Sequence, residues 1–361
     1  MDALVKEELK ACFSGRKVLV TGDSGFKGSW LSLALLELGA QVTGYSLPAP
    51  RAEDHFSALK LDKKIRHVDG DIRDAEHVRR AFQEARPSVV FHLAAQPLVR
   101  LSYADPKTTF DTNVGGSVNV LEAVRATPEI NALVYVTSDK CYENKEWIWG
   151  YREIDELGGK DPYSASKGAA EVVFSSYQRS FFAHREKFGA ASVRAGNVIG
   201  GGDWSADRII PDCIRALMAE SPIVLRNPNS TRPWQHVLEP VFAYILVSMR
   251  LLQEPKRFAS AWNVGPATED VRTVRELAEH VIHTWGAGKL DIKPDPSAPA
   301  EAGLLSLNCD KARFQLKWKP AWHFETAVRE TVQWYKSVAA GGAAATDVSR
   351  SQIRKFMEQS Q

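Results

Sequence analysis

The sequence is poor in cysteine, with four in 361 residues. They are widely scattered, and no two of them form a Cys-x-x-Cys pair. This spacing argues against a disulfide framework, and we expect free thiols in a reducing cytosol. The cysteines are Cys12, Cys141, Cys213 and Cys309.

The sequence also lacks a long apolar run. The longest candidate, VFAYILVSMRLL, is interrupted by Arg250 and is shorter than the roughly 18 residues that a spanning helix needs. The first ten residues, MDALVKEELK, contain no apolar core of a secretory signal. We therefore expect a cytoplasmic protein without a membrane partner.

A strong charge of either sign is missing as well. Lys and Arg number 46 against 44 Asp and Glu, which leaves a formal net charge of +2. This balance gives no sign of the basic surface that binds a nucleic acid, so we do not expect a nucleic-acid partner. Hydrophobic residues make up 44% and charged residues 25%, as in ordinary folded soluble proteins. The length suits one large domain or two moderate ones.

What the sequence does contain is an alternation of apolar strands and helices. Strands are predicted at residues 17–21, 41–47, 65–71, 88–95, 131–138 and 191–195. Helices are predicted at residues 29–40, 74–85, 105–126 and 161–187, the second of them with Asp74 as its N-cap. This order predicts a parallel sheet covered by helices on both faces.

The alternation weakens after about Ala195. Helices at Arg208–Glu220, Pro240–Gln253 and Val274–Trp285 are mixed with loops rich in Pro and Asn, and indicate a smaller, partly interleaved second lobe. The tail VAAGGAAATDVSR reads as a linker of small residues, followed by a short amphipathic piece, QIRKFMEQ.

Three glycines follow the first strand at the mouth of a helix. Gly22, Gly25 and Gly28 form a GxxGxxG turn. Such a turn brings backbone N–H groups and the positive end of a helix close to a pyrophosphate. In this context the turn predicts a dinucleotide site.

The adenosine end of that site is less clear. The acidic residue expected about 20 residues later is missing, and Ser46 stands near its place. Ser46 suits a ribose hydroxyl but would not repel a 2′-phosphate, and Arg51 lies nearby, so these residues leave NAD and NADP both open. Asp71 suits the adenine amino group or a helix cap.

Tyr163 and Lys167 lie four residues apart, on one face of a predicted helix. An ammonium one turn from a phenol lowers the phenol's pKa, so the phenol can act as a base near neutral pH. Beside a dinucleotide turn, this pair is typical of the oxidation of a hydroxyl to a carbonyl, although YxxxK alone is common in surface pairs. Ser138, at the end of the fifth strand, would hydrogen-bond the same oxygen.

Six stretches together carry a resemblance to a known family. They closely resemble the CDP-glucose 4,6-dehydratases, within the extended short-chain dehydrogenases/reductases, and the likeness runs from about Arg16 to Lys336. Asp23 departs from the pattern, which has His there, and we expect it to weaken cofactor affinity. The stretches are TGDSGFKGSWL, HLAAQPLVRLSY, TSDKCYENKEWIWGYRE, DPYSASK, RAGNVIGGGDW and RPWQHVLEP.

The resemblance implies an α/β fold, a Rossmann-like doubly wound parallel sheet with a smaller, partly interleaved C-terminal substrate lobe. The NAD-binding domain would comprise residues 15–195 and about 235–265. The nucleotide-sugar domain would comprise about 196–234 and 266–336, with a linker and a short C-terminal helix at 337–361.

The implied cofactor is NAD and the implied substrate is CDP-glucose. Hydride would leave carbon 4, water would leave across carbons 5 and 6, and hydride would return to carbon 6. The product, CDP-4-dehydro-6-deoxy-D-glucose, serves deoxysugar biosynthesis of the O-antigen or lipopolysaccharide type. The implied NAD contacts are Gly22, Gly25, Phe26, Lys27, Gly28, Ser46, Asp71, Ile72, Leu93, Ala94, Ala95, Tyr163 and Lys167.

The resemblance also assigns catalytic roles. Tyr163 takes the hydroxyl proton, with Ser138 and Lys167 beside it. Asp139 becomes the acid for the leaving 6-hydroxyl, and must then be protonated. Lys140 becomes the base for carbon 5, where the alternative is an exposed turn lysine.

Substrate contacts are expected at Gln96, Asn113, Asn197, Arg208, Arg232 and Asn263. Gln96 and Asn113 would line the sugar pocket, or be buried structural amides. Arg232 would bind the diphosphate, or form a salt bridge at the rim. The residues that select cytosine stay open.

Other interpretations remain. One is another nucleotide-sugar enzyme of this fold, a 4-epimerase or decarboxylase; another is a non-enzymatic NAD-binding regulator. His280 and His283 share a helix face without a third ligand, so no metal is predicted. A homo-oligomer, dimer or tetramer, is expected by analogy. Its interface would use helices 105–126 and 161–187, with Val114, Val118, Val172 and Phe174.

Overall fold

The computed structural model describes residues 3–267, 270–293, 304–339 and 344–360. A parallel seven-stranded sheet in the order β11-β6-β5-β4-β1-β2-β3 forms its centre, which confirms the predicted Rossmann-like fold. The strands are β1 Lys17–Thr21, β2 Gln41–Ser46, β3 Arg66–Asp69, β4 Val89–His92, β5 Ala132–Val136, β6 Gly189–Ala195 and β11 Ala261–Val264.

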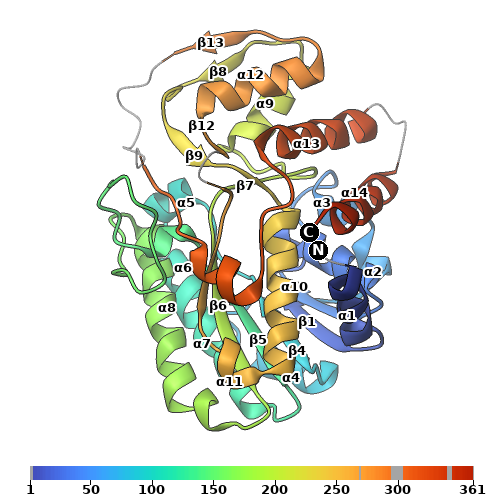
Figure 1. Ribbon diagram of the computed structural model, residues 1–361, viewed down its shortest axis with the longest axis vertical. Helices are drawn as coiled ribbons and strands as arrows, with labels where there is room; N and C mark the ends of the chain where they lie inside the picture. Colours follow the sequence, from blue (N-terminus) through green and yellow to red (C-terminus); the bar gives the residue numbers. More distant parts are fainter. Residues whose placement is uncertain (1–2, 268–269, 294–303, 340–343, 361) are drawn as a thin grey trace.

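Helices cover both faces of this sheet, because alternate strand residues point to opposite sides. Val18 and Val20 of β1 belong to one buried cluster, and Leu19 belongs to another. The first face carries α1 Ala3–Phe13, α2 Phe26–Glu37 and α10 Leu238–Gln253. The second face carries α4 Ala75–Ala85, α7 Ser117–Ala126 and α8 Pro162–Ser180 (Figure 1).

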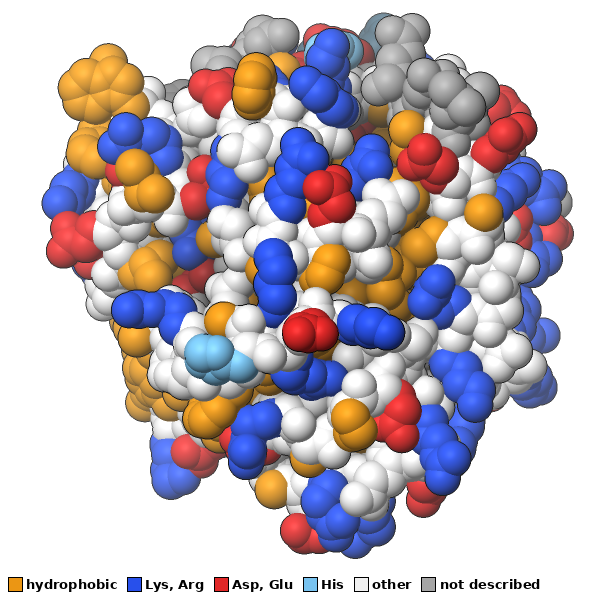
Figure 2. All heavy atoms as spheres, turned by 60° about the horizontal axis from the view of Figure 1, so that its bottom comes forward, with side chains coloured by type: hydrophobic (Ala, Val, Ile, Leu, Met, Phe, Trp, Pro, Cys, Tyr) orange, Lys and Arg blue, Asp and Glu red, His pale blue; other side chains and the backbone are white. Residues whose placement is uncertain are grey.

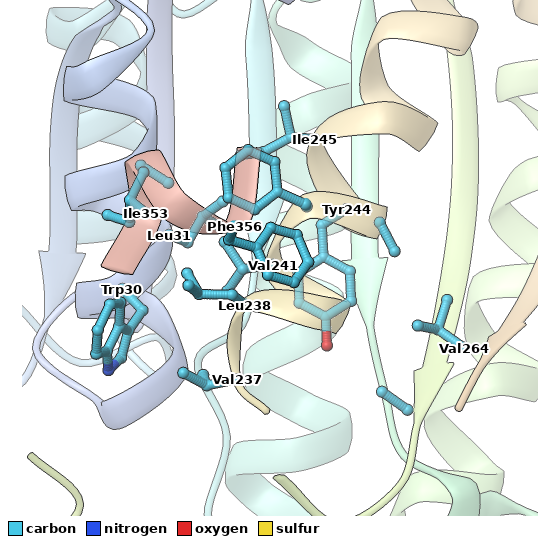
Figure 3. Close-up of a cluster of buried hydrophobic side chains, with 14 of the residues drawn as sticks. Trp30, Leu31, Val237, Leu238, Val241, Tyr244, Ile245, Val264, Ile353 and Phe356 are labelled. Atoms are coloured by element: carbon cyan, nitrogen blue, oxygen red, sulfur yellow. The ribbon is translucent and has the colours of Figure 1, made fainter. Parts of the chain in front are cut away.

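The cluster on the first face is the larger of the two. Figure 3 shows Trp30 and Leu31 of α2, Leu238 and Val241 of α10, and Phe356 near the C-terminus converging there. All five side chains are at most 2% exposed. Burial of each such side chain contributes about 1.5–3 kcal/mol. This cluster therefore anchors α10 and the C-terminal helix to the sheet.

Beyond the carboxyl ends of the large sheet, the upper part of Figure 1 holds helices and short strands that pair in two-stranded sheets. The upper elements are not continuous in the sequence: between β10 and β12 the chain returns to the large sheet, where β11 pairs with β6. The predicted domain boundaries stay a prediction. The elements are β7 Val198–Ile199, α9 Ile209–Met218, β8 Ile223–Leu225, β9 Thr231–Pro233, β10 Gln235–His236, β12 Val271–Thr273, α12 Val274–Trp285, β13 Leu290–Ile292 and α13 Phe324–Ala339.

Two helices begin at an aspartate cap, and one of these caps was predicted. The Asp74 carboxylate accepts a hydrogen bond from the backbone N–H of His77, which confirms the predicted N-cap of α4. Asp161 caps α8 in the same way, and Pro162 occupies its first turn. Shorter helical segments are α3 His55–Ala58, η1 Leu61–Lys63, α5 Val99–Ala104, α6 Pro106–Phe110, η2 Asp111–Gly116, η3 Asp139–Cys141, η4 Phe182–His184, α11 Pro255–Phe258 and η6 Ala312–Leu316.

Two predicted helix ends are wrong. The helix predicted to reach Lys187 ends at Ser180, and a short η4 follows it. The C-terminal helix α14 is longer than predicted and spans Ala345–Gln359, so part of the predicted linker is helical. The reason is that Ser349 is buried on the same side as Ile353 and Phe356, against α2 and α13.

No helix in the described part of the chain is both long enough and apolar enough to cross a membrane. Figure 2 shows basic and acidic side chains scattered over one face of the molecule rather than gathered in a single patch.

Candidate active site

A cavity of about 1290 Å³ lies at the carboxyl ends of the large sheet's strands, and the upper elements contribute to its walls. Ligands of doubly wound folds bind at this edge, where the strand order reverses beside β1. The structure brings most of the predicted site residues to this cavity. They are Gly22, Gly25, Phe26, Lys27, Gly28, Ser46, Asp71, Ile72, Leu93, Ala94, Ala95, Gln96, Ser138, Asp139, Lys140, Tyr163, Lys167, Asn197, Arg208 and Arg232.

The glycine turn connects β1 to α2 and requires glycine at two positions. Gly22 has φ +77°, and a Cβ atom there would lie 2.7 Å from the backbone nitrogen of Ala94. A Cβ atom on Gly28 would lie 2.0 Å from the carbonyl oxygen of Gly22. No side chain caps the N-terminus of α2 at Gly25. The first turn of α2 therefore presents backbone N–H groups to an anion in the cavity.

At the far end of the turn, Ser46 and Asp71 line the cavity from β2 and from the residues after β3. The Ser46 hydroxyl donates to Ser24 Oγ over 2.8 Å. Asp71 accepts hydrogen bonds from Arg73, which lower the pKa of its carboxyl group. Arg51 does not line the cavity; it donates to the carbonyl oxygen of Trp204 over 2.9 Å.

Asp23 turns away from the cavity. Its side chain is fully buried, and Oδ2 lies 2.7 Å from Nδ1 of His67 on β3. Burial lowers the pKa of His67, but the hydrogen bonds and charges of Asp23 and Asp69 outweigh it and raise that pKa. The expected effect of Asp23 on the cofactor stays a prediction, and the geometry gives it no direct route to a ligand.

Tyr163 and Lys167 lie on the first two turns of α8, with the Lys167 ammonium 6.0 Å from the phenol ring centre. Burial of the phenol opposes the expected lowering of its pKa. Burial raises the pKa of Tyr163 to about 12, although a hydrogen bond with Ser138 lowers it in part. Burial also lowers the pKa of Lys167 to about 8, against the charges of Cys141 and Glu171. Lys167 therefore stays mostly protonated near neutral pH, but desolvation is the larger influence on the phenol.

Asp139 and Lys140 follow β5 in the short helix η3, which Ser138 caps. Asp139 is 2% exposed, and its Oδ1 accepts from the Ser138 hydroxyl over 2.9 Å. Its Oδ2 is buried without a hydrogen-bond partner among the described residues. Burial raises the pKa of this carboxyl, against the charge of Lys140 and the hydrogen bond of Ser138. Asp139 is therefore suited to the protonated state, while Lys140 is half-buried in the cavity wall.

Two further cations reach the cavity from the upper elements. Arg208 donates to Oδ2 of Asp203 over 2.8 Å, and Arg232 donates to the carbonyl oxygen of Thr231 over 2.7 Å. Lys27 of α2 adds a third cation. Burial lowers its pKa to about 8, while the charge of Asp139 raises it. The cavity therefore offers several donors to an anionic ligand.

Two predicted substrate contacts do not line the cavity. Asn113 is buried in η2, where it accepts from the backbone N–H of Gln96 and donates to the Ser166 hydroxyl. Asn263 is buried in β11, where it accepts from the Tyr142 hydroxyl and donates to the carbonyl oxygen of Tyr151. Both amides are saturated by the protein, as the structural alternative for Asn113 proposed.

The cavity also contains polar residues that were not predicted from the sequence. Asp203 pairs with Arg208, and Asp207 pairs with Arg100 over 2.8 Å. Asp203 belongs to the stretch RAGNVIGGGDW, which carries part of the family resemblance, but no role was predicted for this residue. In the described part of the chain, no group of three or more His, Cys, Asp or Glu side chains is placed to hold a metal. His280 packs against the ring of Phe324.

The chain is similar in sequence and in fold to proteins that act on nucleotide sugars. Residues 19–331 match the family described as GDP-mannose 4,6-dehydratase. A CDP-glucose 4,6-dehydratase of Salmonella typhimurium is 48% identical over 92% of this chain and 94% of its own. Among solved structures, an epimerase of Methanothermobacter thermautotrophicus covers 98% of both chains at 25% identity, with a TM-score of 0.79. A Thermus thermophilus UDP-glucose 4-epimerase in complex with NAD covers 88% of this chain and 98% of its own at 28% identity, with a TM-score of 0.74.

Proposed function

The chain belongs to the GDP-mannose 4,6-dehydratase family, and we propose that it converts CDP-glucose to CDP-4-dehydro-6-deoxy-D-glucose and water. One observation carries the proposal: a buried carboxyl with a raised pKa, Asp139, stands beside Lys140 in the cavity that also holds Ser138, Tyr163 and Lys167. Oxidation alone needs only the last three residues. The acid and the amine beside them supply what the elimination of water needs.

The residues of the glycine turn fit NAD. Gly22 and Gly28 leave the turn free of side chains, and the uncapped start of α2 suits the pyrophosphate. Ser46 suits a ribose hydroxyl. Arg51 is held at Trp204, outside the cavity, so it is not placed to bind the 2′-phosphate of NADP, and this favours NAD. When bound, NAD would supply a hydride acceptor for carbon 4, a hydride donor for carbon 6 and a positively charged ring.

In the first half of the reaction, Tyr163 takes the proton of the 4-hydroxyl. The Ser138 hydroxyl, which donates to Oδ1 of Asp139 in the structure, would turn its hydrogen bond to the same oxygen, and the Lys167 ammonium lies 6.0 Å from the phenol ring centre. A positive charge close to the phenol would lower its pKa from the raised value of about 12. The carbonyl formed at carbon 4 acidifies the proton on carbon 5.

In the second half, Lys140 takes the proton from carbon 5, and Asp139 gives a proton to the leaving 6-hydroxyl, so that water departs and a double bond joins carbons 5 and 6. Return of the hydride to carbon 6, with return of a proton to carbon 5, would complete the 6-deoxy product. The burial of Asp139 supports this assignment, since it raises the pKa of the carboxyl and so favours the protonated acid. Arg208 and Arg232 would bind the diphosphate through charge-assisted hydrogen bonds, and Asn197 and Gln96 would line the sugar side.

The test is incubation of the purified protein with CDP-glucose and NAD, with analysis of the sugar nucleotide. A 4-keto-6-deoxy sugar is expected, and UDP-, dTDP- and GDP-glucose serve as controls. The epimerases among the similar structures make a 4-epimerase the second candidate. A CDP-galactose product, or no product, would overturn the proposal.

We also propose that the protein works in the cytosol as a homo-oligomer. All four cysteines lie among the described residues and are free thiols, as a reducing compartment allows. Val172 of α8 is 58% exposed and available to a second copy, whereas Phe174 stacks on Tyr135 in the core. A charged side chain in place of Val172 should lower the mass measured by sedimentation; an unchanged mass would exclude this face.

A further inference from the structure

A buried ion pair contacts both ends of the segment 137–142, which carries the proposed acid and base. Glu171 of α8 is 2% exposed and Arg194 of β6 is 4% exposed, and their charged atoms are 2.7 Å apart. Neither residue lines the cavity. A buried ion pair is weak evidence for stability, because well-packed apolar residues often replace one without loss. Its position therefore needs another explanation.

The carboxylate of Glu171 holds the front end of the segment. Oε1 accepts the hydroxyl hydrogen bond of Thr137, and Oε2 accepts one from Ser192 over 2.9 Å in addition to that of Arg194. Thr137 directly precedes Ser138. Its backbone N–H also donates to the carbonyl oxygen of Val193 on β6, over 3.0 Å.

The guanidinium of Arg194 holds the rear end. It donates to the Tyr142 hydroxyl over 2.7 Å, and that hydroxyl donates in turn to Oδ1 of Asn263 over 2.7 Å. The guanidinium carbon also lies 5.0 Å from the centre of the Tyr142 ring. Tyr142 is thus fixed by three contacts: its hydroxyl accepts from Arg194 and donates to Asn263, and its ring faces the guanidinium.

The spacing along α8 connects this network to the catalytic tyrosine. Tyr163, Lys167 and Glu171 are each four residues apart, so they lie on one face of the same helix. The helix that presents the phenol to the substrate therefore also fixes, one turn beyond Lys167, the segment that presents Asp139 and Lys140.

We propose that the Glu171–Arg194 pair is a positioning device for residues 138–141, clamping Thr137 and Tyr142 so that the elimination groups keep register with Tyr163. This inference rests on the proposed function for its chemical consequence. Misplacement of reacting groups by about 1 Å costs up to about a hundredfold in rate. Loss of the clamp should therefore slow elimination more than oxidation. Elimination loses the positions of both Asp139 and Lys140, whereas Tyr163 and Lys167 keep their places on α8 and only Ser138 of the oxidation residues moves.

Removing Glu171 or Arg194 outright would leave a buried charge unpaired and would risk unfolding. Thr137→Val and Tyr142→Phe each remove one hydroxyl instead. Thr137→Ser keeps the donor to Glu171 and serves as the conservative rescue. Tyr244→Phe is the matched control, because the hydroxyl of Tyr244 on α10 is buried without a hydrogen-bond partner among the described residues.

Single-turnover kinetics with CDP-glucose would follow reduced nicotinamide and the 4-keto-6-deoxy product together. Thr137→Val and Tyr142→Phe should form product about tenfold more slowly while reduced nicotinamide accumulates. Thr137→Ser and Tyr244→Phe should behave as wild type. If both phases slow equally in the two clamp variants, or neither slows, the positioning role is excluded.

Hydrogen–deuterium exchange tests the same clamp without any substrate. The amides of residues 138–142 should exchange faster in Thr137→Val and Tyr142→Phe than in Tyr244→Phe. Unchanged exchange would overturn the inference. If wild-type protein gives no product from CDP-glucose, the proposed function fails, whereas the exchange rates still decide whether the clamp exists.

Discussion

The glycine turn at residues 21–28 and the loop at residues 137–142 both line one cavity, at the ends of β1 and β5, yet they are built differently. The turn is determined mostly by close backbone approaches, such as a Gly28 Cβ position 2.0 Å from the oxygen of Gly22. The loop is held by side chains from α8, β6 and β11, through Glu171, Arg194 and Asn263. We therefore expect damage to the loop to change rate constants, and damage to the turn to change cofactor affinity.

The largest effect on rate is expected at Tyr163, whose phenol lies in the cavity beside the loop at residues 137–142. Tyr163→Phe removes the base for the 4-hydroxyl, so the rate of the first oxidation should fall by about a thousandfold. Stopped-flow absorbance should detect no reduced nicotinamide on mixing with CDP-glucose. Tyr177→Phe is the control on the same helix, since that hydroxyl donates to Glu122 instead. Normal oxidation by Tyr163→Phe would remove this residue from the mechanism.

Lys140→Met separates the two halves of the reaction. Oxidation at carbon 4 should continue, while product formation falls by about a hundredfold for want of a base at carbon 5. Reduced nicotinamide should then accumulate, which absorbance measures directly. Lys145→Met, at an exposed loop lysine paired with Glu156, provides the comparison. Near wild-type dehydration by Lys140→Met would mean that Lys140 is structural.

The turn should respond in affinity rather than in chemistry. In Gly28→Ala the added Cβ meets the Gly22 carbonyl, so the turn must shift and the Kd for NAD should rise by roughly 10- to 100-fold. Calorimetric titration with NAD measures this. Gly115→Ala is the control, because a Cβ there has no atom within 4 Å. Unchanged affinity in Gly28→Ala would show that NAD does not bind at this turn.

The smallest effect concerns stability away from both regions. Burial raises the pKa of Glu239 to about 8, although backbone N–H groups of Trp322 and Ala321 lower it in part. Because the folded pKa lies above the unfolded one, the stability that protonated Glu239 supplies is lost as pH rises through about 8. Glu239→Gln should therefore raise the Tm by roughly 3 °C more at about pH 9 than at about pH 6. Calorimetric melting at both values checks this, and an equal shift at both would contradict it.

The same contrast explains what could be read from the sequence. Strand alternation, the glycine turn and the Asp74 cap are local patterns, and each predicts structure from neighbouring residues. Asn113 and Asn263 were expected to contact the substrate but lie outside the cavity, because in the sequence an amide looks the same in a pocket wall and in a core network. The raised pKa of Tyr163 depends on burial, and burial depends on residues distant in the chain. The clamp on Thr137 and Tyr142 joins three distant elements, so no local motif reveals it.

The most direct test of the central claim follows one hydrogen through the reaction. CDP-glucose carrying deuterium at carbon 4 should give CDP-4-dehydro-6-deoxyglucose with that deuterium at carbon 6, as read by mass spectrometry and proton NMR of the product. In heavy water, unlabelled substrate should gain a solvent deuteron at carbon 5. Deuterium returned to carbon 4 of a CDP-hexose that still carries its 6-hydroxyl would contradict the account and identify an epimerase.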